Sequence, residues 1–571
     1  MHASGSGSVG PAVGRRALLG GAIGVAVAAV GAPRLANAAN AGSAAGAGNA
    51  AGAAELWAEY VAAPYAHPQI PFVGRAGAFG GTDDLPNPEV VANALDFGAD
   101  PDGEADSAPA IQAAIAAAAE AGGGAVLLPA GRYRIDDLLH IGADGVVLRG
   151  EGSGRTVIEA TRSLTDLIGR YGSRYGGDKS SWSWAGGLIW LCPTARWRSL
   201  TDAIRAESWP FEGWTGNARD EYESLTEITG SPSLGDWTVQ VAGTDGLAEG
   251  DRVLLRLADD AEHTLLAHMA GEVPGTASYD WASRTKLTSY VPYEWPCRLT
   301  AVDHEAGTVT LDRPLPLDAR PEWDPRLTTL VPPLVGAGVE GLTLVCPELP
   351  LSEHLLDTGF NGVALQCAWD CWVRDVEVTH TDNGFLLVSA KGCTLRDTTV
   401  SGRGSHHPYC CREGSHDNLV EGFTLLDRTS PPPANTQLHG INVEGLSSYN
   451  VWSRGRMEMG TFDSHRGMPF ANVRTEITVN NNGTHGGDDT AGPLYGARFT
   501  HWNVTVTNGR AGMIKLDEIA PRSATVAINE VTEFGQIDQP DFVGELHTRL
   551  ESYGDPSAAD PVNLHAAQRD L

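Results

Sequence analysis

Six of the 17 histidines lie in one stretch of the chain, between residues 405 and 490. Acidic and basic residues are interspersed with them at spacings of a few residues. Together they supply the bases, acids and fixed positive charges that cleavage of a glycosidic bond requires. The histidines are His406, His407, His416, His439, His465 and His485, and the charged residues among and just after them include Glu444, Arg454, Arg456, Glu458, Asp463, Arg466, Asp488, Asp489, Lys515, Asp517 and Glu518.

The segment FDSHRG, residues 462–467, is the strongest single candidate. A lyase that acts on a uronate needs a base for the C5 proton and a cation for the developing carboxylate dianion. His465 would be that base, oriented by Asp463, with Arg466 or Lys515 as the cation. We therefore predict catalytic roles for Asp463, His465, Arg466, His439, Glu444, Lys515 and Asp517, and substrate-binding roles for Arg456, His485, Asp488 and Asp489.

Two other interpretations of these residues stay open. An inverting glycoside hydrolase needs two carboxyl groups about 6.5–9.5 Å apart. Its candidates here are Asp463, Glu444, Asp488, Asp489 and Asp517. A carbohydrate-binding solenoid without catalysis is the third possibility, in which each of these residues is a solvated loop residue or part of a stacked polar ladder.

The sequence identifies no set of metal ligands. Neither a His-x-His nor an HExxH pattern occurs, and no cysteines have zinc-finger spacing. The adjacent Asp488 and Asp489 could help to hold Ca²⁺ through their oxygens, so calcium is the one cofactor kept open.

A repeat explains how these distant residues could meet. The segment CWVRDVEVT from Cys371 returns as CTLRDTTVS from Cys393, and five more copies begin at Gly338, Asn418, Asn472, Ala497 and Ala524. Each copy alternates apolar and polar residues, as a strand with one buried face does. Steps of mostly 22 to 27 residues predict a solenoid in which each period forms one coil of a right-handed parallel β-helix. His439 should then lie one coil from His465.

Residues 92–160 predict how the solenoid begins. A turn at Asp100–Gly103 precedes a helix that Asp106 or Ser107 caps, with Pro109 in its first turn. Ile111, Ile115, Ala118 and Ala119 form its apolar stripe, and Gly122–Gly124 end it. This helix should cover the open end of the solenoid, where an apolar core would otherwise meet water.

This segment, with DFGADPDG and LLPAGRYRI, resembles the pectate lyase superfamily domain of rhamnogalacturonase- and epimerase-like proteins. The resemblance implies the β-helix fold. It leaves the reaction open, since the members it resembles include lyases, hydrolases, uronan epimerases and phage tailspikes. We expect a secreted polysaccharide-degrading enzyme, with β-elimination slightly favoured.

Composition limits the partners. The formal charge is −31, which makes nucleic acid an unsuitable partner and would repel an anionic glycan unless a basic groove or a bound cation offsets it. Arg15 and Arg16 precede a 14-residue apolar run and an Ala-Asn-Ala cleavage site, which predicts a twin-arginine signal peptide over residues 1–38. Its removal takes away three arginines and no acid, so the mature charge becomes −34. We expect a secreted protein that contacts a polysaccharide and no membrane; its oligomeric state is open.

The remaining segments complete the expected organisation. Residues 39–54 should be an Ala/Gly linker, 55–224 an extended N-terminal arm, the capping helix and the first coils, 225–330 an inserted β-rich lobe, 331–535 the main coils and 536–571 a C-terminal cap or tail. The tryptophans of residues 161–224 either form a sugar-binding wall or pack loops onto the solenoid. Cys371 and Cys393, stacked in adjacent coils, either form a disulfide or remain buried thiols, and Cys410–Cys411 is left open.

Overall fold

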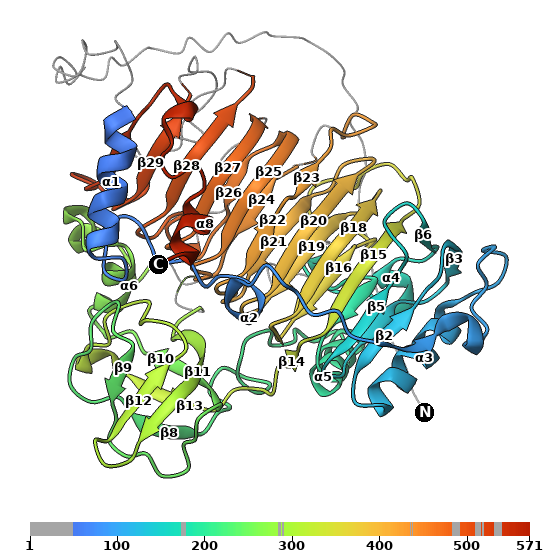
Figure 1. Cartoon of the computed structure of the whole chain (residues 1–571), viewed down its shortest axis with the longest axis horizontal. Helices are drawn as coiled ribbons and strands as arrows, with labels where there is room; N and C mark the ends of the chain where they lie inside the picture. Colours follow the sequence, from blue (N-terminus) through green and yellow to red (C-terminus); the bar gives the residue numbers. More distant parts are fainter. Residues whose placement is uncertain are drawn as a thin grey trace, which may run out of the picture. The chain divides into compact units, whose positions relative to one another are not determined.

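A computed structural model describes the chain over residues 50–172, 179–283, 287, 290–433, 436, 438–481, 491–508, 516, 519–529 and 540–571. The signal peptide and nearly all of the linker that the sequence predicts therefore lie outside the described residues. The unit Gly48–Leu571 is a right-handed parallel β-helix with an N-terminal helix and a separate β-lobe, as the sequence predicted (Figure 1).

The larger sheet of the β-helix contains 15 strands, and every pairing in it is parallel. Strands β3 (Gly131–Ile135), β6 (Thr156–Ala160) and β23 (Thr424–Leu425) pair beside its main path. The main path runs through β1 (Val90–Asn93), β2 (Gly124–Leu127), β5 (Val146–Arg149), β15 (Gly338–Val345), β18 (Trp372–Thr379), β20 (Thr394–Ser401), β22 (Leu419–Glu421), β25 (Val451–Gly460), β27 (Val473–Asn481), β28 (Thr500–Val506), β29 (Ala524–Ile528) and β30 (Arg549–Glu551).

The repeat predicted the strands at the centre of this sheet and missed one of them. All seven sequence copies contribute neighbouring strands, and the register Trp372↔Thr394 is the offset of 22 residues between the first two copies. The missed copy is β25, which inserts between β22 and β27. Gly455 stands at an inward position where the neighbouring strand has Ile477, so the apolar alternation of β25 is weak.

A second parallel sheet of seven strands forms another side of the coil and carries the histidine-rich stretch. Its central strands are buried along their whole length, because one face packs into the solenoid and the other is covered by loops. Its strands are β4 (Leu139–Ile141), β7 (Ile189–Leu191), β16 (Val363–Gln366), β19 (Asn383–Val388), β21 (His407–Arg412), β24 (Ile441–Val443) and β26 (Phe462–Ser464), and β14 (Leu334–Val335) pairs with β17 (Ala368–Trp369) beside it.

A buried asparagine ladder fixes the stacking of three coils. Asn418 donates to Asn450 over 2.8 Å, and Asn450 donates to Asn472 over 3.0 Å. Each amide also binds a backbone carbonyl of a neighbouring turn, so these polar groups are satisfied inside the protein. The ladder sets the register on which the position of the histidines depends.

Helix α3 (Ala108–Glu120) lies at the N-terminal end of the solenoid, where the sequence placed it (Figure 1). Asp106 caps it, since its carboxylate accepts from the backbone N–H of Ala108 over 3.0 Å. Ile111, Ile115 and Ala118 are buried in the same core cluster as the first coils. The helix therefore closes the apolar interior at this end.

The prediction of a linker over residues 39–54 followed by an extended arm is wrong where the two meet. Residues Ala50–Ala62 form a helix of 13 residues, α1. Alanine has the highest helix propensity, and Ala53, Leu56 and Tyr60 recur at helical spacing and are completely buried. Beyond this helix the arm is mostly irregular, apart from the short α2 (Ala78–Gly81). At the other end of the chain, the short helix α8 (Leu564–Arg569) follows the last coil.

The inserted lobe is an antiparallel sheet of six strands, β8 (Ser224–Glu227), β13 (Arg326–Thr328), β10 (Arg252–Leu257), β11 (Tyr293–Asp303), β12 (Thr308–Leu311) and β9 (Thr238–Gln240). It contacts the turns of the solenoid through buried polar groups. The Trp295 indole donates to Asp417 over 3.2 Å, and the Arg313 guanidinium lies 2.7 Å from the same carboxylate. Helix α6 (Thr264–Met269) lies between two of its strands in sequence, and α4 (Leu164–Leu167) and α5 (Thr194–Arg205) precede the lobe.

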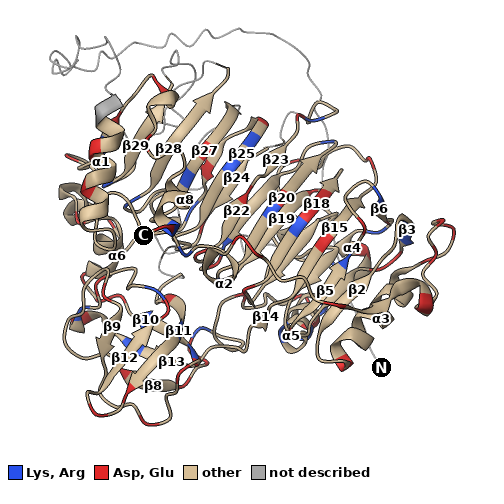
Figure 2. Cartoon of the chain, in the orientation of Figure 1, with Lys and Arg blue, Asp and Glu red and all other residues tan. Residues whose placement is uncertain are grey.

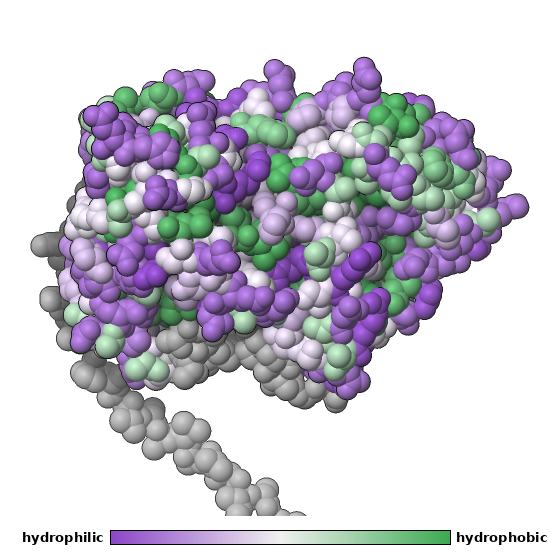
Figure 3. Space-filling model, turned by 90° about the horizontal axis from the view of Figure 1, so that it is seen from below, coloured by the Kyte–Doolittle hydropathy of each residue, from purple (hydrophilic) through white to green (hydrophobic). Residues whose placement is uncertain are grey.

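The surface of the large sheet carries charge in pairs. Figure 2 shows basic and acidic residues side by side across its strands; Arg374 lies 2.8 Å from Glu340 and Arg396 lies 3.2 Å from Glu421. Seen from below, hydrophobic residues form small patches among hydrophilic ones (Figure 3). Among the described residues no helix is long and apolar enough to cross a bilayer.

Candidate active site

Four buried side chains of the seven-stranded sheet converge, and we name them the histidine group: His407, His439, Asp463 and His465. They come from three successive coils, since β21 pairs with β24 and β24 pairs with β26. His407 begins β21, Asp463 lies within β26, and His439 and His465 flank β24 and β26. The register pairs Asp463 with Asn442 of the neighbouring coil, and the four side chains converge over these short strands.

The carboxylate of Asp463 is the centre of the histidine group. The Nδ1 atoms of His465 and His439 lie 3.0 Å and 3.2 Å from its Oδ2, and the Asn442 amide donates to the same oxygen. The His407 ring stacks on the His439 ring, with centroids 4.8 Å apart, and its Nδ1 lies 2.9 Å from the backbone oxygen of Ser183. One potential ligand atom from each member lies within 4.8 Å of the others.

A second aspartate–histidine pair adjoins this group. His406 Nδ1 lies 3.0 Å from Asp357 Oδ2, and the His406 ring centroid is 4.1 Å from that of His407. His354 packs edge-on against His406 at 5.1 Å. The site therefore contains two aspartate–histidine dyads, His465–Asp463 and His406–Asp357, in adjacent positions.

A network of arginines and glutamates borders the histidine group. Glu444 accepts from Arg412 Nε over 2.7 Å and from Arg466 Nε over 2.8 Å. Arg412 also contacts Glu212 at 3.1 Å and Glu413 at 2.9 Å. The Arg466 guanidinium lies over the Trp184 ring, 5.0 Å from its centroid. Both guanidinium groups are thus paired with carboxylates inside the protein.

Burial keeps four of the imidazoles neutral. It lowers the pKa of His439 and of His354, each to about 4. The pKa values of His406 and His407 are held well below the ordinary value by burial and by the neighbouring imidazoles. At neutral pH these rings therefore offer unprotonated nitrogens that can take a proton or bind a metal.

The carboxyl groups respond to burial in two ways. Burial raises the pKa of Asp357 to about 6. It also opposes ionisation of Glu444, but Arg466 and Arg412 outweigh it and hold the pKa of Glu444 well below its usual range. For Asp463 burial is likewise outweighed, by His439 and His465, and its pKa is lowered. Glu444 and Asp463 are therefore ionised.

The structure brings together five of the predicted catalytic residues: Asp463, His465, Arg466, His439 and Glu444. The order of His439 and His465 in adjacent coils is the predicted one. Arg456 lies elsewhere: it is on β25 in the other sheet, where its exposed side chain pairs with Glu458. Alternation along β25 points it to solvent, so it does not join this site. The predicted residues His485, Asp488, Asp489, Lys515 and Asp517, with the Asp488–Asp489 calcium ligands, lie outside the described residues.

Sequence reasoning missed the roles of His407, His406 and Asp357. His407 stands 32 residues before His439, a longer step than the usual coil, and Asp357 stands 49 residues before His406. The insertions that lengthen these steps hide the alignment. A signal was present in the adjacent pair His406–His407, which stands at the start of β21.

The histidine group also has the composition of a metal site, which the sequence analysis did not identify. Three imidazoles and one carboxylate are donors that Zn²⁺ and related ions accept, whereas Ca²⁺ prefers oxygen ligands. The ligands come from separate coils, so no local sequence motif marks them.

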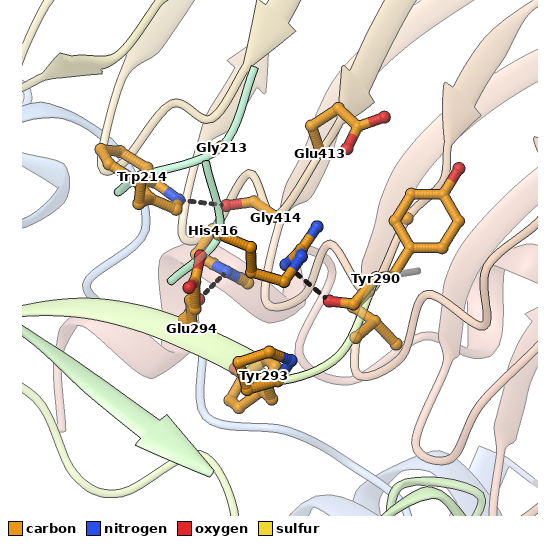
Figure 4. A pocket seen from close by; sticks show the side chains of 12 residues that line it. Gly213, Trp214, Tyr290, Tyr293, Glu294, Glu413, Gly414 and His416 are labelled. Atoms are coloured by element: carbon orange, nitrogen blue, oxygen red, sulfur yellow. Dashed lines mark hydrogen bonds between the residues drawn. The ribbon is translucent and has the colours of Figure 1, made fainter. Parts of the chain in front are cut away.

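Three clefts elsewhere on the protein are less suited to a polysaccharide reaction. One of about 20 Å³ lies between the lobe and the solenoid turns, where His416 and Glu294 face Tyr290 and Trp214 (Figure 4). Its His416 ring is fixed by the Glu294 carbonyl and the Ser448 hydroxyl, each at 2.9 Å. The others, of about 160 and 180 Å³, adjoin the N-terminal arm and the lobe. The tryptophans Trp182, Trp184, Trp190 and Trp214 are buried, which favours packing over an open sugar-binding wall.

Comparisons with known proteins agree with the sequence resemblance over a limited segment. Residues 91–190 match the family described as rhamnogalacturonase A/epimerase, pectate lyase-like. Mannuronan C5-epimerase AlgE1 of Azotobacter vinelandii is 48% identical over 99 residues, which are 16% of this chain and 7% of the epimerase. Alginate lyase 7 of the same organism is 49% identical over 86 residues, 13% of this chain and 10% of the lyase.

The solved structures extend over more of the chain at low identity. The tailspike gp49 of Pseudomonas phage LKA1 has a TM-score of 0.41 at 12% identity and covers 81% of this chain and 79% of its own. The A-module of Azotobacter vinelandii mannuronan C-5 epimerase AlgE6 has a TM-score of 0.33 at 12% identity, covering 81% and 98%. The matched family segment ends before the histidine group. Within residues 91–190 this chain is similar to the pectate lyase-like family described as rhamnogalacturonase A/epimerase.

Proposed function

We propose that this chain is an exported enzyme that cleaves a uronate-containing polysaccharide by β-elimination. The observation that carries the proposal is the pair of adjacent aspartate–histidine dyads, His465–Asp463 and His406–Asp357, beside buried arginines. The named relatives act on mannuronan and alginate, and their names describe epimerases and a lyase. This is the class of substrate that the proposal assigns to this chain.

The reaction begins at C5 of the uronate. A neutral imidazole of one dyad takes the C5 proton, and the paired aspartate stabilises the imidazolium that forms. The electron pair left at C5 forms the C4–C5 double bond as the C4–O4 bond breaks. The departing oxygen takes a proton, which the second dyad or water supplies. A cation must stabilise the carboxylate dianion before the C–O bond breaks.

Epimerisation is the second candidate, because it shares the first step and because epimerases are among the matched relatives. In that reaction the intermediate takes a proton on the opposite face and the C4–O4 bond survives. Hydrolysis is supported less well. Of the carboxyl groups described at the site, Glu444 is paired with two arginines, Asp463 with two histidines and an amide, and Asp357 with His406. None is set up as the free acid of an inverting pair.

Incubation of the full mature chain with a panel of uronans and neutral glycans tests the proposal. β-Elimination gives new reducing ends and the ultraviolet absorbance of an unsaturated uronate in equal amounts. Epimerisation gives neither, but in D₂O it exchanges the C5 proton for deuterium, which NMR detects. New reducing ends without the unsaturated product would mean hydrolysis and would overturn the proposal.

Variants place the reaction at the site. His465→Gln and His406→Gln should each lower kcat by about 10²–10⁴-fold if that ring transfers a proton. His416→Gln is the matched control, because His416 is equally buried but lies at the lobe interface, and its activity should be retained. Full activity in both His465→Gln and His406→Gln would remove the histidine dyads from the mechanism.

A further inference from the structure

The histidine group has buried atoms that no protein group satisfies. In the part of the chain that the structure describes, His439 Nε2 and Asp463 Oδ1 have no hydrogen-bond partner, although both are shielded from solvent. On the same carboxylate, Oδ2 receives His439, His465 and Asn442 together. Buried polar atoms normally have partners, so two orphan atoms in one group point to a ligand that binds there.

The outer contacts of the group are those that hold metal ligands in place. His407 Nδ1 faces the Ser183 carbonyl, so Nδ1 carries the proton. The unprotonated Nε2 is then the atom that can bind a metal ion. The Asn442 amide holds Asp463, and the Cys410 thiol lies 2.9 Å from the Asn442 oxygen. A second layer of hydrogen bonds therefore orients two of the four side chains.

The charges of the described residues around the histidine group also favour a cation. Among the described residues, the guanidinium groups of Arg412 and Arg466 face the carboxylates of Glu212, Glu413 and Glu444, and Asp463 faces His439 and His465. With neutral imidazoles these groups have a net formal charge of −2. The buried groups Arg403 and Arg474 with Asp357 and Asp382 do not change this balance, and the positive charge nearby on Lys179, which acts on His354, is exposed to solvent. Uncompensated charge inside a protein is costly, and one divalent cation would neutralise the group.

We propose that His407, His439, Asp463 and His465 bind one divalent first-row transition ion, of which Zn²⁺ is the best fit. Three imidazole nitrogens and one carboxylate oxygen within 4.8 Å of one another suit the N/O coordination of such an ion, and the nitrogen majority disfavours Ca²⁺ and Mg²⁺. The site draws its ligands from three coils, so it forms only when the solenoid has folded.

The ion would supply what the described protein groups do not, and this part of the inference rests on the proposed function. Arg412 and Arg466 are already paired with glutamates, so the positive charge of each guanidinium group is offset by a carboxylate of the protein. An ion in the histidine group can instead bind the uronate carboxylate and stabilise the dianion that forms when C5 loses its proton. His465 then acts as a ligand, and the His406–Asp357 dyad, whose ring lies against His407, becomes the base.

Metal content of the full mature chain is the first test. The protein is treated with a chelator, mixed with an equimolar set of Zn²⁺, Mn²⁺, Ca²⁺ and Mg²⁺, passed through a gel-filtration column and analysed by elemental mass spectrometry. We expect one Zn²⁺ per chain and no retained Ca²⁺ or Mg²⁺. Co²⁺ in place of Zn²⁺ should give the visible absorption of a four- or five-coordinate ion. Less than one tenth of an equivalent of any transition ion would overturn the site.

Variants identify the ligands. Asp463→Asn and His439→Gln should lose stoichiometric binding, whereas Asn442→Ala, which removes an outer partner, should weaken binding by about 10–100-fold. The matched control His416→Gln should bind like the unaltered chain. Circular dichroism of each metal-free variant checks that it has folded. Full Zn²⁺ binding by Asp463→Asn would refute the assignment even if the unaltered chain binds zinc.

The same preparations separate this inference from the proposed function. One Zn²⁺ per chain with no product and no C5 exchange from any uronan would refute the proposed function and leave the ion site standing. Product formed at an undiminished rate by chelated protein would refute the catalytic role of the ion. Activity that chelation abolishes and Zn²⁺ restores supports both.

Discussion

Glu444→Gln tests whether the arginine–glutamate network maintains the site. The substitution keeps the shape of the side chain and removes one buried charge that accepts from Arg412 over 2.7 Å and from Arg466 over 2.8 Å. Breaking a buried ion pair by removing one partner costs about 3–5 kcal/mol, because the other charge is left uncompensated. Glu212 and Glu413 still contact Arg412, so part of the pairing of Arg412 survives the substitution.

The magnitude can be converted into a melting temperature. At roughly 2.1 cal/mol/K per residue, about 520 folded residues give an unfolding entropy of about 1.1 kcal/mol/K. A loss of 3–5 kcal/mol then lowers Tm by about 3–5 °C. The matched control is Glu458→Gln, which removes the exposed pair with Arg456 and should cost less than about 1 kcal/mol.

Differential scanning calorimetry of the two variants beside the unaltered chain is the assay. We expect a clear downward shift for Glu444→Gln and a shift of no more than about 1 °C for Glu458→Gln. Equal shifts in Tm would refute the reasoning, because the buried Glu444 carboxylate would then contribute no more to the free energy of unfolding than the exposed Glu458 carboxylate does. A higher Tm in Glu444→Gln would show that burying this charge costs more than its pairing returns.

Three further predictions concern acid, thiols and salt. Burial lowers the pKa of His416 to about 3, so below pH 6.5 this imidazole is protonated in the unfolded chain and stays neutral in the folded chain. The free energy of unfolding should therefore fall by about 2 kcal/mol at pH 5. Urea unfolding of His416→Gln should show a smaller fall between pH 7.5 and 5, and an equal fall in both proteins would contradict this. All eight cysteines, including Cys371 and Cys393, are free and buried, so a thiol reagent should react with eight groups after unfolding and with few before it; six or fewer would restore the disulfide alternative. If the substrate is a uronan, kcat/KM should rise severalfold between about 20 mM and 150 mM NaCl as screening weakens repulsion from the negative chain, whereas an unchanged value would indicate a neutral glycan.

The fold was predictable because its signal is repeated. Alternation in seven strand copies and a spacing of 22 residues between two of them are enough to define the coil, and the register Trp372↔Thr394 follows directly. The strand β25 was missed because Gly455 replaces an aliphatic residue at an inward position. The helix α1 was missed because an Ala/Gly-rich segment has the composition of a linker, while its burial depends on tertiary contacts.

The site was predictable only in part, because it depends on alignment between coils of unequal length. His439, Asp463 and His465 are separated by ordinary steps, so their proximity followed from the period. His407 and Asp357 are brought in across insertions, and the length of an insertion does not say where its ends return. The metal-site composition was hidden for the same reason: ligands that share no local motif become visible only in three dimensions.

A strongly negative chain can accept an acidic glycan if the local charge of the site, and not the total, decides binding. At physiological ionic strength the Debye length is about 8 Å, so most of the formal charge of −31 is screened from a substrate that approaches the site. Screening is weaker inside the protein, where the net formal charge of −2 counted over the described charged residues around the histidine group would act on a uronate through protein instead of water. Only there does a bound divalent cation change repulsion into attraction. The affinity for a uronan should therefore depend far more on whether a divalent cation is bound in the histidine group than on the removal of any surface carboxylate.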